Sequence, residues 1–140
     1  MFDVDLTYDP AVLQFDSVAF GDPVLGDQLD LSGLGTITGF DGSVAGAVNH
    51  FELSLDPAVD LDALQAGAFT LSVFRFTALN PGVSPVELSL NSLGDAQGDP
   101  LAAQWGGARL TVIPEPASAG LWFAMGSAAW IVFRRGRARP

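Results

Sequence analysis

FDVDLTY, residues Phe2–Tyr8, alternates strictly between apolar and polar side chains. A period of two residues is typical of a β-strand that has one face buried and the other in water. Pro10 ends the segment, because proline has no backbone N–H to give to a sheet. The start of the chain therefore predicts a half-buried strand in which Phe2, Val4 and Leu6 face a core.

Similar signals recur along the sequence at short spacing. They lie at Leu13–Phe20 (with an irregularity near Asp16-Ser17), Thr36–Phe40, Ala45–Leu55, Phe69–Leu79, Val86–Leu90 and Arg109–Ile113. In the fourth of these the apolar phase slips between Val73 and Phe74, which predicts a bulge or burial on both faces. Gly21–Gly35 and Leu93–Pro100 are expected to be loops.

Three connections carry specific signals. Asp41-Gly42 is typical of a tight hairpin turn, and Asn80-Pro81-Gly82 is typical of a turn. The segment Asp60–Gln65 predicts one short helical turn, with Asp60 as N-cap and with Leu61 and Leu64 packing inward.

Seven or eight short strands with almost no helix favour an all-β fold, an antiparallel β-sandwich, with a barrel as the alternative. Its core is expected to include Phe15, Phe51, Phe69 and Phe76. Burial of each of these rings contributes roughly 1.5–3 kcal/mol, which is adequate for a core of this size.

The charge of the chain is unevenly distributed. The 140 residues carry a formal net charge of −10, but four of the six arginines follow residue 133. Residues 1–116 therefore hold 2 basic against 16 acidic side chains, 2 − 16 = −14. A domain this acidic repels phosphate backbones, so nucleic acid is not expected as a partner.

The residue inventory excludes several kinds of site. The chain has no cysteine and a single histidine, His50. Disulfides, thiolate zinc sites and cysteine nucleophiles are therefore impossible, and a histidine-rich metal site is excluded. A Ser-His-Asp relay would have to use His50. We interpret His50, next to Phe51, as a strand-edge residue instead.

The loop before the last strand holds the few candidates for ligand binding. Asp95, Gln97 and Asp99 place oxygen atoms at alternate positions, which suits Ca²⁺, although the EF-hand spacing is not completed. An ordinary Asp-Gly-rich turn is the favoured interpretation. Trp105 suits stacking on a sugar ring, but an anchor in the core is favoured. Apart from this possible Ca²⁺ ion, no cofactor is expected.

A second part of the chain begins at residue 114. Ala117–Phe133 is an uncharged apolar run of membrane length, at the lower limit for crossing a bilayer of about 30 Å. Trp122 and Trp130 lie toward its ends, where indole rings prefer the membrane interface. The tail that follows begins with Arg134 and Arg135, and positive charge stays cytoplasmic. A single-pass helix with a cytoplasmic C-terminus is therefore expected; the alternative is a buried core helix with a solvated tail.

Pro114, Glu115 and Pro116 precede this helix as a stiff, extended segment that cannot join it. The stretch Val112–Arg139, with Ile-Pro-Glu-Pro-Ala, the apolar run and the arginine cluster, resembles a PEP-CTERM sorting signal. The resemblance implies recognition by an exosortase at the inner membrane of a Gram-negative bacterium. It also implies export to the cell envelope or outside, in an organism that makes exopolysaccharide or biofilm matrix.

Met1 directly precedes a strand in which apolar and polar residues already alternate. A C-terminal membrane-sorting segment is expected to accompany an export signal at the N-terminus. We therefore expect a misplaced or truncated start that removed a signal and one further strand. Such a sandwich would have an unpaired edge.

Residues 1–113 resemble cohesin-like domains. The resemblance rests on Phe2–Leu13, an alternating strand that ends in Tyr-Asp-Pro, on Phe69–Ala78, which ends in Phe-Thr-Ala, and on the loop Leu93–Leu101. It implies a jelly-roll sandwich related to carbohydrate-binding modules, with a dockerin-like protein or a polysaccharide as partner. The chain departs from the family in apparently lacking the first strand.

The sequence therefore predicts a cohesin-like domain, residues 1–113, followed by a sorting signal, residues 114–139, which comprises the motif 114–116, the helix 117–133 and the tail 134–139. The expected function is that of an exported, non-catalytic binding module for protein docking or carbohydrate. The alternatives are a glycoside hydrolase, with two carboxylates among the sixteen acids, and a purely structural matrix protein.

Overall fold

The computed structural model describes residues 1–114, which form seven strands and one short helix. The elements are β1 (Phe2–Thr7), β2 (Leu13–Phe20), β3 (Thr36–Asp41), β4 (Ala47–Ser54), α1 (Ala58–Leu64), β5 (Ser72–Ala78), β6 (Gly82–Leu93) and β7 (Ala108–Val112). All strand pairs are antiparallel. The predicted all-β class is confirmed.

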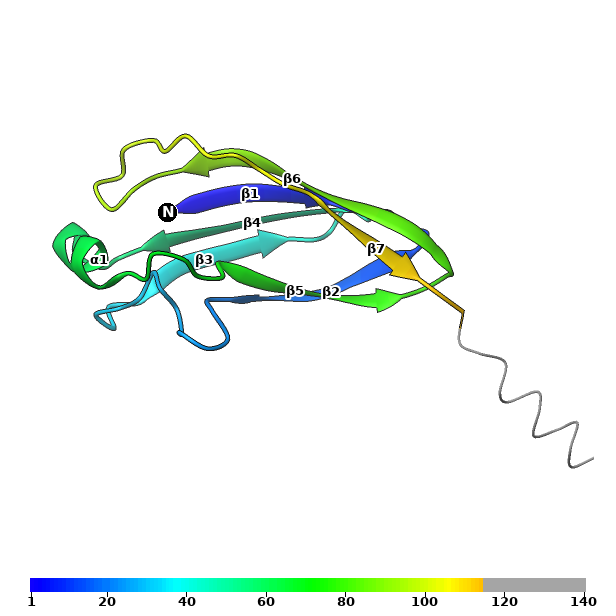
Figure 1. The fold of residues 1–140 in the computed structure, drawn as a ribbon, viewed down its shortest axis with the longest axis horizontal. Coiled ribbons are helices and arrows are strands. Elements are labelled where there is room, and N and C mark those ends of the chain that lie inside the picture. Colours follow the sequence, from blue (N-terminus) through cyan, green and yellow to red (C-terminus); the bar gives the residue numbers. More distant parts are fainter. Residues whose placement is uncertain (115–140) are drawn as a thin grey trace, which may run out of the picture.

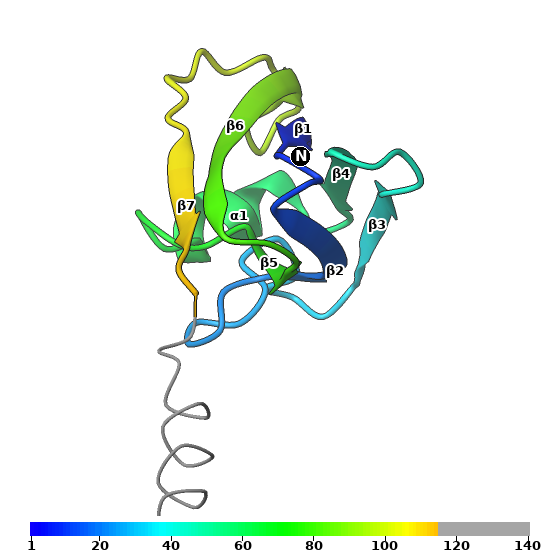
Figure 2. The ribbon, with the colours of Figure 1, turned by 90° about the vertical axis from the view of Figure 1, so that its right-hand side faces the viewer.

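The strands form two layers of unequal size. One is a five-stranded sheet in the order β3-β4-β1-β6-β7, and the other is the pair β2-β5. Viewed from one end, the larger sheet curves from β7 over β1 to β3, and the smaller sheet lies beneath it (Figure 2). Helix α1 lies at the same end of the sandwich as the start of β1 (Figure 1). A sandwich, and not the alternative barrel, is observed.

The core lies between these two layers. Phe2, Val4 and Leu6 of β1 are all buried there, as their alternation predicts. Phe20 and Leu71 approach them from the side of the smaller sheet. Because β1 is the middle strand of its sheet, its apolar face is covered along its whole length.

Strand β2 has an irregularity where the sequence places one. Its register against β5 shifts between Phe15 and Ser17, so that Asp16 is the extra residue. The slip predicted between Val73 and Phe74 is not a bulge of β5, since both residues pair in regular succession with β2. Phe69 and Leu71 precede β5, so that strand is shorter than expected.

The connections differ from the predicted ones in two places. Asp41 is the last residue of β3, and the turn to β4 runs through Gly46, which has φ +89°. The connection is therefore longer than a two-residue hairpin. Helix α1 begins at Ala58 after Pro57, so Asp60 lies in its first turn and is not its N-cap. Proline is well suited to a helix start because its φ is already helical.

The apolar residues of strand β4 suggest that the face with Phe51 is buried. The structure buries the other face of the strand. Val48, His50 and Glu52 are buried, whereas Phe51 and Leu53 are exposed. The reason is pairing, because Val48, His50 and Glu52 lie directly opposite Leu6, Val4 and Phe2 of β1. Side chains opposite each other on neighbouring strands share a face of the sheet. The expectation that Phe51 belongs to the core is therefore wrong.

Candidate functional site

The outer face of the larger sheet carries the most distinctive surface chemistry of residues 1–114. Its centre is a cluster of carboxylates and amides on adjacent strands. Asn49 of β4 donates from Nδ2 to Oδ1 of Asp3 and of Asp5, at 2.8 Å each. Asn91 of β6 donates to the same oxygen of Asp3 at 3.2 Å. These bonds fix four polar side chains on three strands in one arrangement.

An apolar patch lies beside this cluster, on β3 and β4. Ile37 is 50% exposed, Phe51 37% and Leu53 39%, and Ile37 lies directly opposite Leu53 in the register of the two strands. Gly39, opposite Phe51, leaves room for its ring, since a Cβ on the glycine would lie 2.5 Å from Cε1 of Phe51. The ring therefore approaches the backbone of β3 at Gly39. We call the cluster and the patch together the outer face.

The outer face suits a protein partner better than a reaction. Its polar groups already hydrogen-bond one another on an open sheet surface, and apolar side chains stand exposed beside them. Protein interfaces combine exposed apolar anchors with a polar surround in this way. An open surface of carboxylates and amides favours a binding partner that offers hydrogen-bond donors, such as hydroxyl, amide and basic side chains.

His50 lies on the opposite, inner side of the same strand. It is 3% exposed, and its ring packs against Phe74 with centroids 4.6 Å apart and against Phe2 at 5.2 Å. Burial lowers the pKa of His50 and so favours the neutral imidazole, partly opposed by the backbone carbonyl of Val4, which accepts a hydrogen bond from the ring. His50 is thus a core residue of an interior strand and not the strand-edge residue expected. A substrate at the surface does not reach it.

The loop after β6 is a closed turn. Oδ1 of Asp95 accepts the backbone N–H groups of Gln97 at 2.9 Å and of Asp99 at 2.8 Å. The backbone N–H of Asp95 in turn donates to the carbonyl of Asp99 at 2.9 Å. Among residues 1–114 no group of three His, Asp or Glu side chains is arranged to hold a metal ion. The Ca²⁺ site at Asp95 and Asp99 stays a prediction.

Trp105 lies in the segment between β6 and β7 and is 39% exposed. The favoured expectation, an anchor in the core, is therefore wrong. The indole lies on none of the strands that form the outer face. Its role as a ligand-binding residue stays a prediction.

The remaining predicted residues belong to the C-terminal segment. Pro114 is the last residue that the structure describes, and it is exposed. Glu115, Pro116, Trp122, Trp130, Arg134 and Arg135 lie outside the described residues. Within residues 1–114, no helix has both the length and the apolar character needed to cross a bilayer.

Sequence reasoning missed the outer face. It placed Phe51 in the core because Phe51 is an apolar member of the alternation in β4. The available signal was Asn49, which shares their face and whose amide suits the Asp3 and Asp5 carboxylates of a paired strand. That pairing could not be known before the fold.

Comparison with solved structures identifies the fold. The cohesin module of a family 33 glycoside hydrolase from Clostridium perfringens is 10% identical, with a TM-score of 0.55 over 81% of this chain and 74% of that one. The sixth cohesin of Acetivibrio cellulolyticus scaffoldin B, in complex with a Cel5 dockerin, is 15% identical, with a TM-score of 0.52 over 80% and 77%. No protein-family model and no curated protein matches the sequence. The chain therefore has a cohesin-like fold.

Proposed function

We propose that this chain is a non-catalytic docking module that binds a partner protein through its outer face. The observation that carries the proposal is the outward placement of Phe51 and Leu53 beside the Asp3–Asn49–Asp5 cluster. Apolar side chains that are exposed to water carry a free-energy cost, and a partner that covers them removes that cost.

A dockerin-like module is the partner that we propose. The likeness to cohesin modules supports it, because the Acetivibrio cellulolyticus cohesin is bound to a dockerin. The charge of the surface gives independent support. Asp3 and Asp5 lie on the outer face, and Glu87, opposite Thr7, lies on the same side of the sheet. Residues 1–116 hold two arginines against sixteen acids. A partner with hydroxyl or basic side chains at the contact is complementary to it.

Binding to a panel of dockerin modules, with and without calcium, tests the docking function. We expect Phe51→Ser and Asp5→Ala each to weaken capture of the partner by roughly 30-fold, the effect of losing about 2 kcal/mol at a central contact. Val59→Ser, at an exposed site on α1 away from the outer face, is the matched control and should leave capture unchanged.

Two outcomes would overturn the docking proposal. One is capture that survives both outer-face substitutions. The other is retention on insoluble polysaccharide with release of reducing sugar, lost on changing a single carboxylate, which would identify a glycoside hydrolase. Retention on polysaccharide without release of sugar would indicate carbohydrate binding in place of protein docking.

We further propose that the segment after β7 is a PEP-CTERM sorting signal for an exosortase, which inserts in the inner membrane and directs the domain to the envelope or the exterior. Its support is the sequence Ile113–Ala117 with the apolar run and the arginines behind it. The last strand of the described residues, β7, ends at Val112, two residues before Pro114.

Fractionation of producing cells tests the sorting function. The chain fused to a bacterial export signal is expected in the membrane or envelope fraction, and replacement of Arg134 and Arg135 by glutamate is expected to disturb its orientation or retention. Arg75→Glu, on strand β5, is the control for charge alone. Equal recovery of all three chains as soluble protein would refute the proposal.

A further inference from the structure

Gly39 lies inside strand β3 at a position where the backbone does not require glycine. Its φ is outside the left-handed region that favours glycine, and it pairs in regular register with Phe51 of β4. Glycine inside a strand weakens the strand, because it has no side chain to pack and loses much conformational freedom on folding. The presence of glycine at this position therefore has its reason in packing and not in backbone geometry.

The ring of Phe51 supplies that reason. A Cβ atom on residue 39 would lie 2.5 Å from Cε1 and 2.8 Å from Cζ of Phe51, whereas ordinary contact begins at 3.4 Å. The ring thus occupies the space that a side chain at position 39 would take. The two atoms belong to the far end of the ring, so the ring leans from β4 toward β3.

The neighbour of Phe51 on the other side is Asp3. Asp3 of β1 lies directly opposite Phe51, as Gly39 does on β3, and neighbouring strands are only about 4.8 Å apart. A ring that leans toward Gly39 therefore leans away from Asp3. Both hydrogen bonds that the Asp3 carboxylate accepts within residues 1–114, from Asn49 and Asn91, end on Oδ1. Oδ2 keeps its capacity for a further donor.

We propose that Gly39 is a specificity-determining residue of the outer face, because the absence of a side chain lets the Phe51 ring lie against β3 and leaves the Asp3 carboxylate open beside it. The inference rests on the proposed docking function and states what the partner has to offer. The partner brings an apolar side chain to the Phe51 ring and, next to it, a hydrogen-bond donor to Asp3. Gly39 keeps these two contacts separate.

A side chain at position 39 changes this surface without disrupting the fold. With Gly39→Ala the Phe51 ring has to move by about 0.9 Å to reach a contact of 3.4 Å. Movement away from β3 takes the ring either toward Asp3, where it covers the carboxylate, or outward into the space of the partner. Interfaces pack as closely as protein interiors at their centre, so either movement weakens binding. The fold has only to accommodate the rotation of an exposed side chain.

A double-mutant cycle tests the role of Gly39 in docking. The probe is the dockerin module that the full chain captures most tightly from the panel described above. Gly39→Ala is expected to weaken its capture by roughly tenfold, with a denaturation midpoint equal to or above that of the unmodified chain. In a chain that already carries Phe51→Ala, the same substitution is expected to change capture by less than about twofold, because no ring remains to be displaced.

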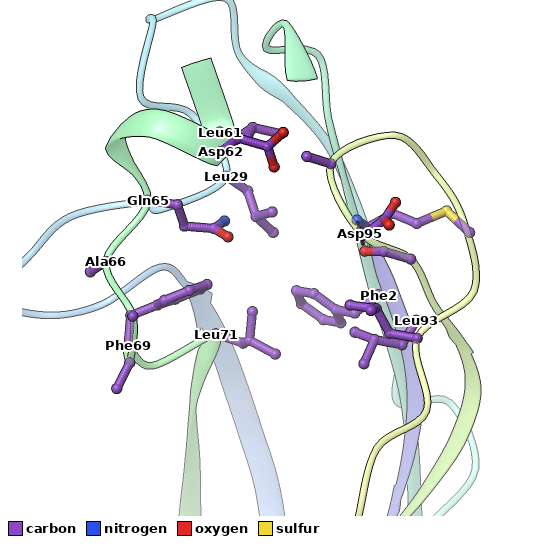
Figure 3. A pocket seen from close by; sticks show the side chains of 16 residues that line it. Phe2, Leu29, Leu61, Asp62, Gln65, Ala66, Phe69, Leu71, Leu93 and Asp95 are labelled. Carbon is purple, nitrogen blue, oxygen red and sulfur yellow. Dashed lines mark hydrogen bonds between the residues drawn. The ribbon is translucent and has the colours of Figure 1, made fainter. Parts of the chain in front are cut away.

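The matched control is a glycine on another surface. Gly67 lines a pocket of about 580 Å³ at the α1 end of the sandwich, together with Leu61, Phe69 and Leu71 (Figure 3). Its φ is not in the left-handed region, and a Cβ there would meet nothing within 4 Å. Gly67→Ala therefore removes a glycine without displacing a ring, and it should leave capture unchanged.

Nuclear magnetic resonance tests the position of the ring without any partner. The backbone amide of Gly39 and the side-chain amide of Asn49 lie on either side of the Phe51 ring, whose π-electrons shift the signals of nearby protons. Phe51→Ala is expected to shift the Gly39 amide signal, and Gly39→Ala is expected to shift the side-chain amide signal of Asn49. Gly67→Ala should move neither signal.

Three results would overturn the inference. They are capture that Gly39→Ala leaves unchanged, an equal loss of capture with and without the Phe51 ring, and an Asn49 signal that Gly39→Ala does not shift. A loss of stability in Gly39→Ala with full capture would make the glycine purely structural and would also overturn it. Failure of the unmodified chain to capture any dockerin refutes the docking function and this inference with it, whereas full capture by Gly39→Ala refutes this inference alone.

Discussion

Glu52 has the largest side chain among the fully buried residues of the described part of the chain, at 1% exposure. Neither carboxylate oxygen has a hydrogen-bond partner there. Burial raises the pKa of Glu52 to about 7, opposed by the Thr36 hydroxyl and supported by the nearby Asp27 carboxyl. A buried carboxyl without a partner is stable in its neutral form, because charging it in an apolar surround is costly.

This burial predicts a dependence of stability on pH. The folded state keeps the proton of Glu52 up to about pH 7, whereas the unfolded chain releases it near pH 4.5. The contribution of Glu52 to the free energy of unfolding is therefore fully present below pH 4.5 and falls as the pH rises toward 7. At roughly 1.4 kcal/mol per pKa unit the loss amounts to about 3 kcal/mol.

Urea denaturation at pH 5 and pH 7.5 measures this loss. His50, whose pKa is lowered by burial, contributes in the opposite direction, since its stabilisation grows as the pH rises. We therefore compare the chain with Glu52→Gln, which retains His50, and expect the variant to be the less sensitive to the rise in pH. Glu87→Gln, at an exposed site on β6, should match the unmodified chain. The same pH dependence in all three would contradict the assignment.

At the scale of elements, helix α1 closes the end of the sandwich through one side chain. Leu61 is 6% exposed and lines the pocket, whereas Leu64 is 61% exposed. The sequence places both leucines inward. Leu61 lies in the middle of the helix, whereas Leu64 is its last residue, directly before the chain becomes extended at Gln65.

Leu61→Ala is therefore expected to lower the free energy of unfolding by about 2–3 kcal/mol, the cost of leaving a cavity. Leu64→Ala is expected to change it by less than about 0.5 kcal/mol. Chemical denaturation of both variants measures the two values. Equal losses of unfolding free energy in the two variants would show that Leu64 also packs against the core.

Strands β1 and β4 show why some elements are predictable and others are not. In β1 only one of the two alternating sets is apolar, so its inward face follows from composition. In β4 the sets Val48-His50-Glu52 and Asn49-Phe51-Leu53 are both mixed, and the more apolar one points outward. Its face is set by pairing with β1, which lies more than forty residues away in the sequence.

At the scale of the whole molecule, charge is the dominant feature. Residues 1–116 carry 2 − 16 = −14 formal charges. Carboxylates crowded on a small fold repel one another and destabilise the compact state. The carboxylates of Asp22 and Asp41 are exceptions, because hydrogen bonds in the folded state lower the pKa of each; for Asp41 these bonds come from Ser43. Backbone N–H groups of Leu25, Thr70 and Val24 lower the pKa of Asp22 to about 2.

The melting temperature at pH 7 is therefore expected to rise by several degrees between 10 mM and 0.5 M sodium chloride. Salt shortens the range of the repulsion from about 30 Å at 0.01 M to a few ångströms. The control is the same salt series at pH 3.5, where many carboxylates are protonated and the rise should be smaller. A melting temperature that does not change with salt at pH 7 would show that the repulsion is unimportant for stability.

The sequence by itself determined the all-β class, the inward face of β1 and the irregularity at Asp16-Ser17. These depend on local alternation, on proline and glycine, and on charge, and all of them act between near neighbours in the chain. Only the tertiary structure decided which face of β4 is buried and that Phe51 and Asn49 stand together on the outer face. Those features depend on which distant strands pair, because a cross-strand neighbour fixes the direction of a side chain more firmly than its own hydrophobicity does.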